Sequence, residues 1–482
     1  MRPGWLLLLA IATFAGVARP ATAQDVGGHL YSGFVLIDPQ TATRTEAAWL
    51  LVRDRRIEAV GAGAPPQGDF VRHDMRGLYA MPGLIDAHAH ITSGPQRVSV
   101  VDGQVRVEIT TDDEFSRSNA AIALAFGVTS VRSPGGSTAA AERYDVMTTQ
   151  GRWIGPEARH AGAVIQPPPF VGESFAYPGS PDAWDAEAAR QAAAGMTYLK
   201  LYTDLTEDEL AAGAAAARAH GLIPIAHLNA VSWTRALELG VRQFEHALPT
   251  SSALLEHEVR DAYVYGPDFM TRWWELADLD GPLLQELARA LADADAVVDL
   301  TLSVNQMVYF ADAWDSVLPE RLSPPDYVHP AQLAALAPSN AAMQAAPPEL
   351  LARGKAVWPR VLAFARMLHE AGVSLMIGTD GNGGAGLGQE LENHVRAGIP
   401  VWEVLRMATS GNADLIGFTQ TGRVAPGYEA DLVFLEADPV DDVRNIERVS
   451  FVVNNGVLFR QEDLLQMARA IADGARSGAA RQ

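Results

Sequence analysis

Met81-Pro82-Gly83-Leu84-Ile85-Asp86-Ala87-His88-Ala89-His90 is the first segment of this 482-residue chain in which a buried apolar run ends in chelating residues. The run over residues 84–88 predicts a strand. Side chains two residues apart on a strand lie on the same face, so His88 and His90 can bind one metal ion together. A His-x-His pair alone is a weak signal, because polar residues are common at strand ends. The rest of the chain has to supply further ligands.

Apolar segments that alternate with Ala-rich helical stretches follow this segment. Such alternation is typical of βα units around a parallel sheet. With the first segment included, the predicted strands are residues 84–88, 128–131, 158–164, 197–202, 223–227, 243–246, 297–302 and 374–379. Eight such strands indicate an α/β protein with a closed (β/α)8 TIM-like barrel over residues 81–421.

Both ends of the chain differ from the barrel pattern. Residues 24–80 hold short alternating apolar segments between Asp-Pro, Arg-Asp-Arg and Pro-Pro turns, which predicts antiparallel strands. The same pattern returns in residues 422–482, for example in Leu432-Val433-Phe434-Leu435. We therefore expect the two ends to form one small β-sandwich domain beside the barrel.

Residues 1–23 are typical of a secretory signal peptide. Arg2 precedes an apolar run from Trp5 to Ala18, and Ala21-Thr22-Ala23 supplies the small residues that a signal peptidase reads. A membrane anchor is the alternative, but the run is shorter than the about 20 apolar residues that span a bilayer. The sequence predicts cleavage after Ala23 and a periplasmic or secreted protein.

The composition excludes several classes of site and partner. The chain has 37 Lys and Arg against 58 Asp and Glu, a formal net charge of −21, which disfavours nucleic acid and anionic membranes as partners. It has no cysteine, which excludes disulfides, thiolate metal sites and Cys nucleophiles. Any metal ion must therefore be held by His, carboxylate or modified Lys side chains.

Polar residues also lie at the ends of later predicted strands. Lys200 ends the fourth strand, His227 the fifth and His246 the sixth, and Asp380 follows the eighth. Barrels of this kind build their active sites at the carboxyl ends of the strands. Lys200 is one of only two lysines in the chain. A neutral amine there can take up carbon dioxide and give an anionic carbamate that bridges two ions. The alternative is a lysine that pairs with an acidic residue at the rim.

With these motifs the chain resembles the metal-dependent amidohydrolase superfamily, in its imidazolonepropionase-like branch. The matching segments are residues 81–90, Gly127-Val128-Thr129-Ser130-Val131-Arg132, Leu199-Lys200-Leu201-Tyr202, His227, Phe244-Glu245-His246, Gly378-Thr379-Asp380 and Pro426-Gly427-Tyr428-Glu429-Ala430-Asp431-Leu432-Val433. The resemblance implies two divalent metal ions, with zinc expected. The implied ligands are His88, His90 and Asp380 for the first ion, His227 and His246 for the second, and N6-carboxylated Lys200 as the bridge.

Two positions depart from the usual pattern of the branch. Peptide-cleaving members commonly carry an aromatic residue two positions after the fifth-strand His, where this chain has Asn229. An acidic residue often follows the second-strand Arg, where this chain has Ser133. Both departures leave the ligand set intact and bear on the substrate.

Two segments are longer than a barrel needs. Residues 249–281 and 305–353 carry aromatic side chains, namely Tyr263, Tyr265, Phe269, Trp273 and Trp274 in the first and Tyr309, Phe310 and Trp314 in the second. Long excursions between regular elements are usually lids or binding loops. The alternative is that these aromatic side chains pack against the rim of the barrel.

The sequence therefore predicts an exported binuclear-metal hydrolase that cleaves an amide bond of peptide or N-acyl amino acid type. A hydroxide that bridges the two ions would attack the carbonyl carbon, and Asp380 would carry its proton to the leaving amine. The alternatives are an esterase, lactonase or cyclic-amide hydrolase with the same site, or a non-catalytic metal-binding protein of the envelope. The expected partner is a small-molecule or dipeptide-like substrate, and we expect the chain to form a homo-oligomer.

Overall fold

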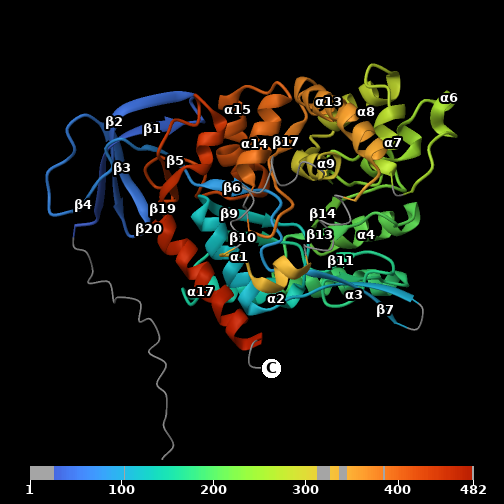
Figure 1. Ribbon diagram of the computed structural model, residues 1–482, viewed down its shortest axis with the longest axis horizontal. Helices are drawn as coiled ribbons and strands as arrows, with labels where there is room; N and C mark the ends of the chain where they lie inside the picture. Colours follow the sequence, from blue (N-terminus) through green and yellow to red (C-terminus); the bar gives the residue numbers. More distant parts are fainter. Residues whose placement is uncertain are drawn as a thin grey trace, which may run out of the picture.

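Eight parallel strands of the described chain form a barrel at the centre of the molecule (Figure 1). They are β6 (Leu84–Asp86), β9 (Val128–Ser133), β10 (Glu157–His160), β13 (Tyr198–Leu201), β14 (Ile223–Ala226), β15 (Gln243–Glu245), β16 (Val297–Asp299) and β17 (Ser374–Met376). A bridge between Ala161 and Tyr198 joins β10 to β13, and the Ala87 N–H donates to the Ile377 carbonyl at 2.9 Å, joining β6 to β17. The predicted α/β barrel is confirmed.

The structure is a computed structural model that describes residues 27–101, 104–266, 268–311, 326–335, 345–383 and 386–479. The predicted signal peptide, residues 1–23, lies outside these residues, and so does Trp314 of the second long excursion.

The third predicted strand, residues 158–164, differs from the prediction because it breaks into two. After β10 the chain leaves the ladder and resumes as β11 (Val164–Ile165), which pairs with β13 and with β12 (Phe175–Ala176). The N–H of Gly162 donates to the Gln191 side chain at 3.1 Å, and the N–H of Ala163 donates to Thr138 Oγ1 at 3.1 Å. Side chains of two helices therefore take the backbone donors that a continuous strand would use.

Helices surround the barrel on its outer side (Figure 1). Those described are α1 (Asp113–Ala125), α2 (Thr138–Thr149), α3 (Pro181–Ala193), α4 (Glu207–Ala219), α5 (Trp233–Glu238), α8 (Pro282–Asp293), α13 (Pro348–Glu370), α14 (Leu387–Arg396), α15 (Val401–Arg406), the π-helical turn η3 (Met407–Gly411) and α16 (Asn412–Ile416). Side chains cap several of these helices: Asp112 accepts two N–H bonds at α1, and Thr206 forms a capping box with Glu209 at α4. Local sequence thus sets where these helices begin.

Both ends of the chain contribute to a second sheet beside the barrel (Figure 1). Its order is β20-β19-β18-β5-β1-β2-β3, with β4 also paired to β1. The strands are β1 (His29–Asp38), β2 (Thr43–Arg53), β3 (Arg56–Ala62), β4 (Val71–Asp74), β5 (Tyr79–Pro82), β18 (Leu432–Leu435), β19 (Val449–Asn454) and β20 (Val457–Arg460), with the 3-10 turn η4 (Val443–Glu447) before β19. The antiparallel pair β5–β18 joins the two chain ends, as predicted.

One detail of this small β domain differs from the antiparallel prediction. Strands β1, β2 and β3 are antiparallel, but β4 and β5 both run parallel to β1. Tyr31 and Phe34 of β1 pack against Phe434 of β18, with the rings of Phe34 and Phe434 5.5 Å apart and edge to face. These aromatic contacts lie in a core separate from that of the barrel. The exact domain boundaries, 24–80 with 422–482 and 81–421, stay a prediction.

The last helix, α17 (Gln461–Ala479), leaves the small sheet and runs along α1 of the barrel (Figure 1). Ala468 of α17 packs in one buried cluster with Ala121 and Ile122 of α1. The Gln461 side chain also donates to the Ala125 carbonyl at 3.0 Å. The end of the chain therefore fastens the small β domain to the barrel.

The long excursions contain short helices. Residues 249–281 hold η1 (Ser252–Leu254), α6 (His257–Arg260) and α7 (Phe269–Leu276), and the second excursion begins within α9 (Leu302–Tyr309). Trp273 and Trp274 are fully buried, so these two aromatic side chains pack against the barrel, whereas Tyr265 is 55% exposed. The sequence also did not indicate the hairpin of β7 (Gln96–Val101) and β8 (Gln104–Ile109).

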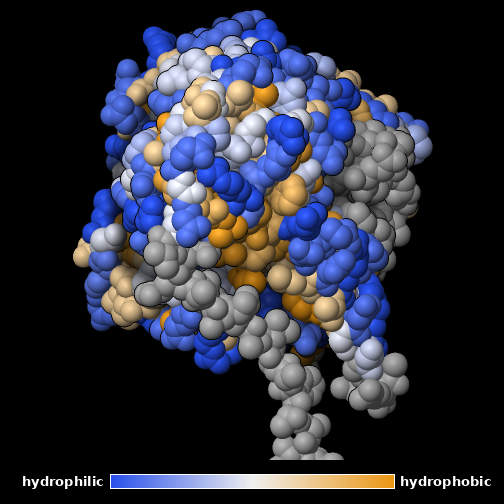
Figure 2. Space-filling view, turned by 90° about the vertical axis from the view of Figure 1, so that its left-hand side faces the viewer, coloured by the Kyte–Doolittle hydropathy of each residue, from blue (hydrophilic) through white to orange (hydrophobic). Residues whose placement is uncertain are grey.

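Hydrophilic residues cover most of the face formed by the small β domain, and hydrophobic residues gather toward its middle (Figure 2). Two of the large hydrophobic side chains exposed in this domain are Val71 and Val457. Among the helices in the described ranges, none combines the length and the apolar character needed to cross a bilayer.

A buried carboxyl of the small β domain gives a testable pH effect. Asp431 accepts the Asn455 N–H at 2.7 Å and the Thr421 hydroxyl at 3.0 Å, and burial raises its pKa from 3.8 to about 6. The folded protein keeps a proton that the unfolded chain releases between about pH 4 and pH 6, so this group lowers stability as pH rises through that window. Asp431→Asn cannot ionise; its oxygen can accept the Asn455 N–H, and its NH₂ group can donate to the Thr421 hydroxyl, so both contacts are kept with the second one reversed.

We expect Asp431→Asn to raise the free energy of unfolding at pH 8, by at most about 3 kcal/mol, and to remove this part of the pH dependence. Urea unfolding of both metal-free proteins between about pH 4 and pH 8 measures the effect. A variant that is less stable than the wild type at pH 8 would show that the ionised carboxylate is well solvated in the fold.

Candidate metal centre

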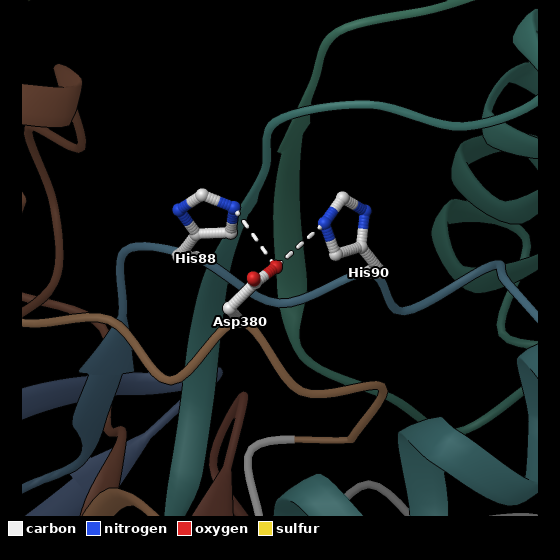
Figure 3. Close-up of side chains that lie close together, drawn as sticks. All are labelled: His88, His90 and Asp380. Atoms are coloured by element: carbon white, nitrogen blue, oxygen red, sulfur yellow. Dashed lines mark hydrogen bonds and ion pairs between the residues drawn. The ribbon is translucent and has the colours of Figure 1, made fainter. Parts of the chain in front are cut away.

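Three of the predicted ligands meet where the first and last strands of the barrel adjoin (Figure 3). His88 and His90 follow β6, and Asp380 follows β17. The Asp380 N–H donates to the His88 carbonyl at 2.8 Å, and the His90 N–H donates to the Gly381 carbonyl at 2.7 Å. Nε2 of His88 and Nε2 of His90 lie 3.2 and 3.0 Å from the same oxygen, Asp380 Oδ1.

The other ring nitrogen of each of these histidines already faces an acceptor. His90 Nδ1 lies 2.8 Å from the Gly135 carbonyl, so it donates there. His88 Nδ1 lies 3.0 Å from Glu245 Oε2 and 3.1 Å from Asp299 Oδ2. In the neutral tautomer that these contacts select, Nε2 presents a lone pair to an anionic oxygen. Such a contact is stable when the nitrogen and the oxygen share a cation, which is either a proton that makes the ring an imidazolium or a metal ion bound by both.

The pKa shifts of His88 and Asp380 agree with a positive charge at this place. Burial lowers the pKa of His88, but the carboxylates of Asp380, Asp299 and Glu245 outweigh it and hold the pKa well above 6.5. Burial likewise opposes ionisation of Asp380, yet His88 holds the pKa of that carboxyl well below its usual range. The pocket is therefore built to stabilise a positive charge beside Asp380.

The remaining predicted ligands, Lys200, His227 and His246, lie at the ends of β13, β14 and β15. The ring of His246 is 5.0 Å from that of His88 and 4.4 Å from that of His227, centre to centre. His246 Nδ1 lies 2.6 Å from Thr301 Oγ1, which leaves Nε2 available. Both ring nitrogens of His227, and Nζ of Lys200, are buried and have no hydrogen-bond partner among the described residues.

Unsatisfied polar atoms at this depth are costly, so they point to a bound group. Burial, followed by the charges of His246 and Lys200, lowers the pKa of His227 well below 6.5, and burial chiefly lowers the pKa of His246 to about 3. Burial also lowers the pKa of Lys200, assisted by Arg132 and opposed by Glu245. Neutral imidazoles are metal ligands, and a neutral amine is the form that can be carboxylated. The ligand roles of these residues stay predictions.

A buried ion network beneath the site was not predicted. Arg132, at 1% exposure, donates to Glu245 Oε1 and Oε2 at 2.9 Å each, to Asp299 Oδ2 at 3.0 Å and to the Ala87 carbonyl at 2.7 Å. Glu245 and Asp299 in turn face His88. They could form a second ligand group with His88, but Arg132 already occupies both carboxylates. We therefore interpret this group as support for the His88 ring.

The backbone is strained at three positions in the mouth of the barrel. His246, Thr301 and Asp380 have φ values of 68°, 38° and 56°, in the left-handed region that non-glycine residues seldom adopt. Each follows a strand end, and the turn aims the side chain into the mouth. Strain of this kind persists where the surroundings hold a functional geometry in place.

Asn229, one of the two departures, has a structural role beside His227. Its amide donates to the Tyr265 hydroxyl at 3.0 Å, and its carbonyl oxygen accepts from Thr250 Oγ1 at 2.6 Å. Asn229 thereby connects the fifth strand end to the excursion of residues 249–281. The ring of Tyr202 lies 4.9 Å from the ring of His227, and the ring of Phe170 lies 6.3 Å from the ring of Tyr202, centre to centre. Aromatic side chains thus line this part of the mouth.

Comparisons with known sequences give short matches. A profile of the Amidohydrolase family matches residues 325–459. The chain is 36% identical to ochratoxinase from Aspergillus niger over 98 residues, and this match covers 19% of the chain. The chain thus spans only 20% of the length of the curated relatives that it matches.

Comparisons with solved structures cover nearly all of the chain. A bottromycin amidohydrolase has a TM-score of 0.67 at 22% identity, with 93% of this chain and 90% of that chain covered. A Xaa-Pro dipeptidase with methionine bound in its active site has a TM-score of 0.64 at 20% identity, covering 90% and 99%. Aspergillus niger ochratoxinase has a TM-score of 0.60 at 18% identity, covering 90% and 96%. At these identities the likeness establishes a shared fold.

Proposed function

We propose that the chain is a metal-dependent hydrolase of the amidohydrolase superfamily and that it cleaves an amide bond of peptide or N-acyl amino acid type. The observation that carries the proposal is the convergence of His88 Nε2 and His90 Nε2 on one oxygen of Asp380, next to the ring of His246, which in turn contacts the ring of His227. This donor set suits two divalent ions held by nitrogen and oxygen.

In this proposal His88, His90 and Asp380 hold the first ion, and His227 and His246 hold the second. N6-carboxylated Lys200 provides the shared anionic ligand, and zinc is the metal that we expect. Two such ions polarise an amide carbonyl and lower the pKa of a bound water to near 7.

Asp380 has the position of a proton carrier. Its Oδ1 faces His88 and His90, and its Oδ2 lies 4.0 Å from His246 Nδ1, so the carboxylate lies between the two proposed ligand groups. Asp380 is ionised, because its pKa lies well below the usual range, and in this proposal the carboxylate takes up the proton of the attacking water. We propose that it then passes the proton to the leaving amine.

The aromatic side chains at the mouth of the barrel favour a substrate that carries an apolar or aromatic group. Tyr202 lies beside His227 and Phe170 lies beside Tyr202, and Tyr265 packs against Phe269 with ring centres 4.7 Å apart. Faces and edges of such rings pack well against another ring or a branched side chain. A panel of dipeptides, N-acyl aromatic amino acids and lactones, each tested with Zn²⁺ or Mn²⁺, separates the amide proposal from the ester and lactone alternative.

Metal removal provides the first test of the proposed function. We expect two ions per chain in the loaded protein, and we expect hydrolysis to stop when a chelator removes them. His88→Ala should lose the first ion and activity, because Asp380 and His90 alone give an incomplete ligand set. His220→Ala is the matched control, since His220 is partly exposed and pairs with Asp185 at 2.8 Å, away from the site. Elemental analysis counts the ions, and a protein that never holds more than one would contradict the binuclear site.

We further propose that the protein is exported and that residues 1–23 are removed. N-terminal sequencing of protein recovered from the periplasm or the medium should begin at Gln24, because Ala21-Thr22-Ala23 ends the leader pattern. Protein that begins at Met1 in the cytoplasm would contradict export and would leave the hydrolase proposal unaffected.

A further inference from the structure

We propose that Glu390, which lies outside the predicted ligand set, is a positioning residue that holds His246 in its metal-binding orientation through the first turn of α9. The inference rests on the proposed function in one respect, the role of His246 as a ligand. Glu390 lies on α14 and is completely buried. A buried carboxyl needs a structural or chemical reason to be there.

Glu390 caps a helix to which it does not belong. Its Oε1 accepts the Leu302 N–H and its Oε2 accepts the Ser303 N–H, each at 2.7 Å. These are the first two amides of α9, which have no partner within the helix itself. A carboxyl group at a helix N-terminus satisfies such donors. Burial raises the pKa of Glu390 to about 8, and the two N–H bonds oppose that rise because they favour the ionised form.

The residue that would ordinarily cap α9 is used elsewhere. Thr301 occupies the N-cap position, but in the described chain its side chain makes no capping bond. Its Oγ1 instead lies 2.6 Å from His246 Nδ1, and it accepts the Nδ1 proton in the tautomer that the proposed ligand role of His246 requires; φ at Thr301 is 38°. Because Glu390 satisfies the amides of α9, the Thr301 hydroxyl is free to bind His246.

This division of roles fixes the chemistry of His246. A proton held on Nδ1 by Thr301 leaves Nε2 as the lone-pair nitrogen that a metal ion needs. Without the Glu390 acceptor, the Thr301 hydroxyl is the nearest replacement cap for α9 and would compete for those amides. His246 would then lose its acceptor. The same turn also contacts the neighbour of Asp380, since Ser303 Oγ donates to the Thr379 carbonyl at 3.4 Å.

The other contacts of Glu390 do not compete with its bonds to α9. His394, one turn later on α14, donates from Nδ1 to the Glu390 backbone carbonyl at 2.9 Å, and the same nitrogen is 3.4 Å from Oε1. The two carboxylate oxygens therefore remain directed at α9. A glutamine at this position has only one acceptor oxygen, and its NH₂ group would face an amide donor.

The test measures metal affinity in the absence of any substrate. Metal-free protein is titrated with Zn²⁺ in competition with a chelating dye, and the ion held by His227 and His246 is identified by its loss in His227→Ala. We expect Glu390→Gln to weaken binding of that ion about 10- to 100-fold and to leave the other ion nearly unchanged. Asp431→Asn is the matched control, because Asp431 is also a buried carboxyl that accepts a backbone N–H.

A double-mutant cycle distinguishes positioning from general damage. Thr301→Ala should weaken binding of the same ion, whereas Thr301→Ser, which keeps the hydroxyl, should bind it with nearly wild-type affinity. Adding Glu390→Gln to Thr301→Ala should lower the affinity little further, because both substitutions act on one contact. Additive losses, or unchanged affinity in folded Glu390→Gln, would overturn the inference. If Glu390→Gln does not fold, Glu390→Asp, which keeps both acceptor oxygens but shortens their reach, provides the same comparison. A wild-type protein that binds no second ion would instead count against the proposed function.

Discussion

Lys200→Ala should lose the second metal ion and nearly all turnover. In the proposed site the carboxylated amine is the anion shared by both ions, and its removal leaves two cations close together without a common ligand. We expect turnover to fall at least about 100-fold, the size of effect that follows loss of one preorganised charge in an active site. Elemental analysis and the rate on the best substrate of the panel measure the two effects together.

Lys200→Arg separates this role from a simple ion pair. Lys200 Nζ lies 4.0 Å from Glu245 Oε1, so an ion-pair role is the competing interpretation. Arginine keeps the positive charge but stays protonated, and it cannot be carboxylated. The carbamate role predicts that Lys200→Arg fails as completely as Lys200→Ala.

Rescue provides a further arm of this test. Short-chain carboxylic acids can occupy the space vacated in Lys200→Ala and replace the lost anion without restoring the amine. We expect partial recovery of the second ion and of turnover when they are added. Full metal content and most of the activity in Lys200→Arg would rule out the carbamate and favour the ion pair with Glu245.

Arg132→Ala should be the most destabilising single substitution in the barrel core. Arg132 is buried. Among the described residues, the carboxylates of Glu245 and Asp299 form ion pairs only with Arg132, His88 and Lys200. Its removal leaves two buried negative charges without most of their compensation. Breaking a buried ion pair in this way costs about 3–5 kcal/mol. Urea unfolding of the metal-free protein gives the change in the free energy of unfolding.

Arg235→Ala is the control for this prediction. Arg235 also binds two carboxylates, those of Glu207 and Glu238, but its side chain is 43% exposed. Solvent compensates such a loss, so we expect little change in the free energy of unfolding. If the two arginine variants lose equal stability, the network beneath His88 contributes little to folding. Arg132→Lys should give an intermediate result, because one ammonium group cannot reproduce the planar fork of donors.

The strands of the barrel and the predicted ligands are readable from local patterns. Short apolar runs that end in His or Asp mark both the strand and its carboxyl end, so His88, His227, His246 and Asp380 could be assigned to one mouth. The break after His160 could not be predicted in this way. It depends on Gln191 and Thr138, which are side chains of two separate helices that take the backbone donors of Gly162 and Ala163.

The supporting residues of the site were missed for a related reason. Asp299 and Thr301 lie within the predicted strand of residues 297–302, and their position in its carboxyl-terminal part was the one available signal. Their importance lies in pairings with His88 and His246, which are distant in the sequence. Glu390 is less visible still, because within an amphipathic helix it resembles any solvent-facing acid. Only the folded chain shows that it is buried against the start of α9.

The adjacency of the first and last barrel strands also sets an order of events in biosynthesis. His90 and Asp380 are separated by 290 positions in the sequence. A ribosome adding about 5–20 residues per second needs roughly 15–60 s to cover that distance. Throughout this interval the nascent chain carries His88 and His90 without the carboxylate that faces them. The complete set of proposed ligands for the first ion can therefore form only after synthesis has passed residue 380. If the chain crosses a membrane before it folds, the metal supply of the receiving compartment, and not that of the cytoplasm, determines which ion is acquired.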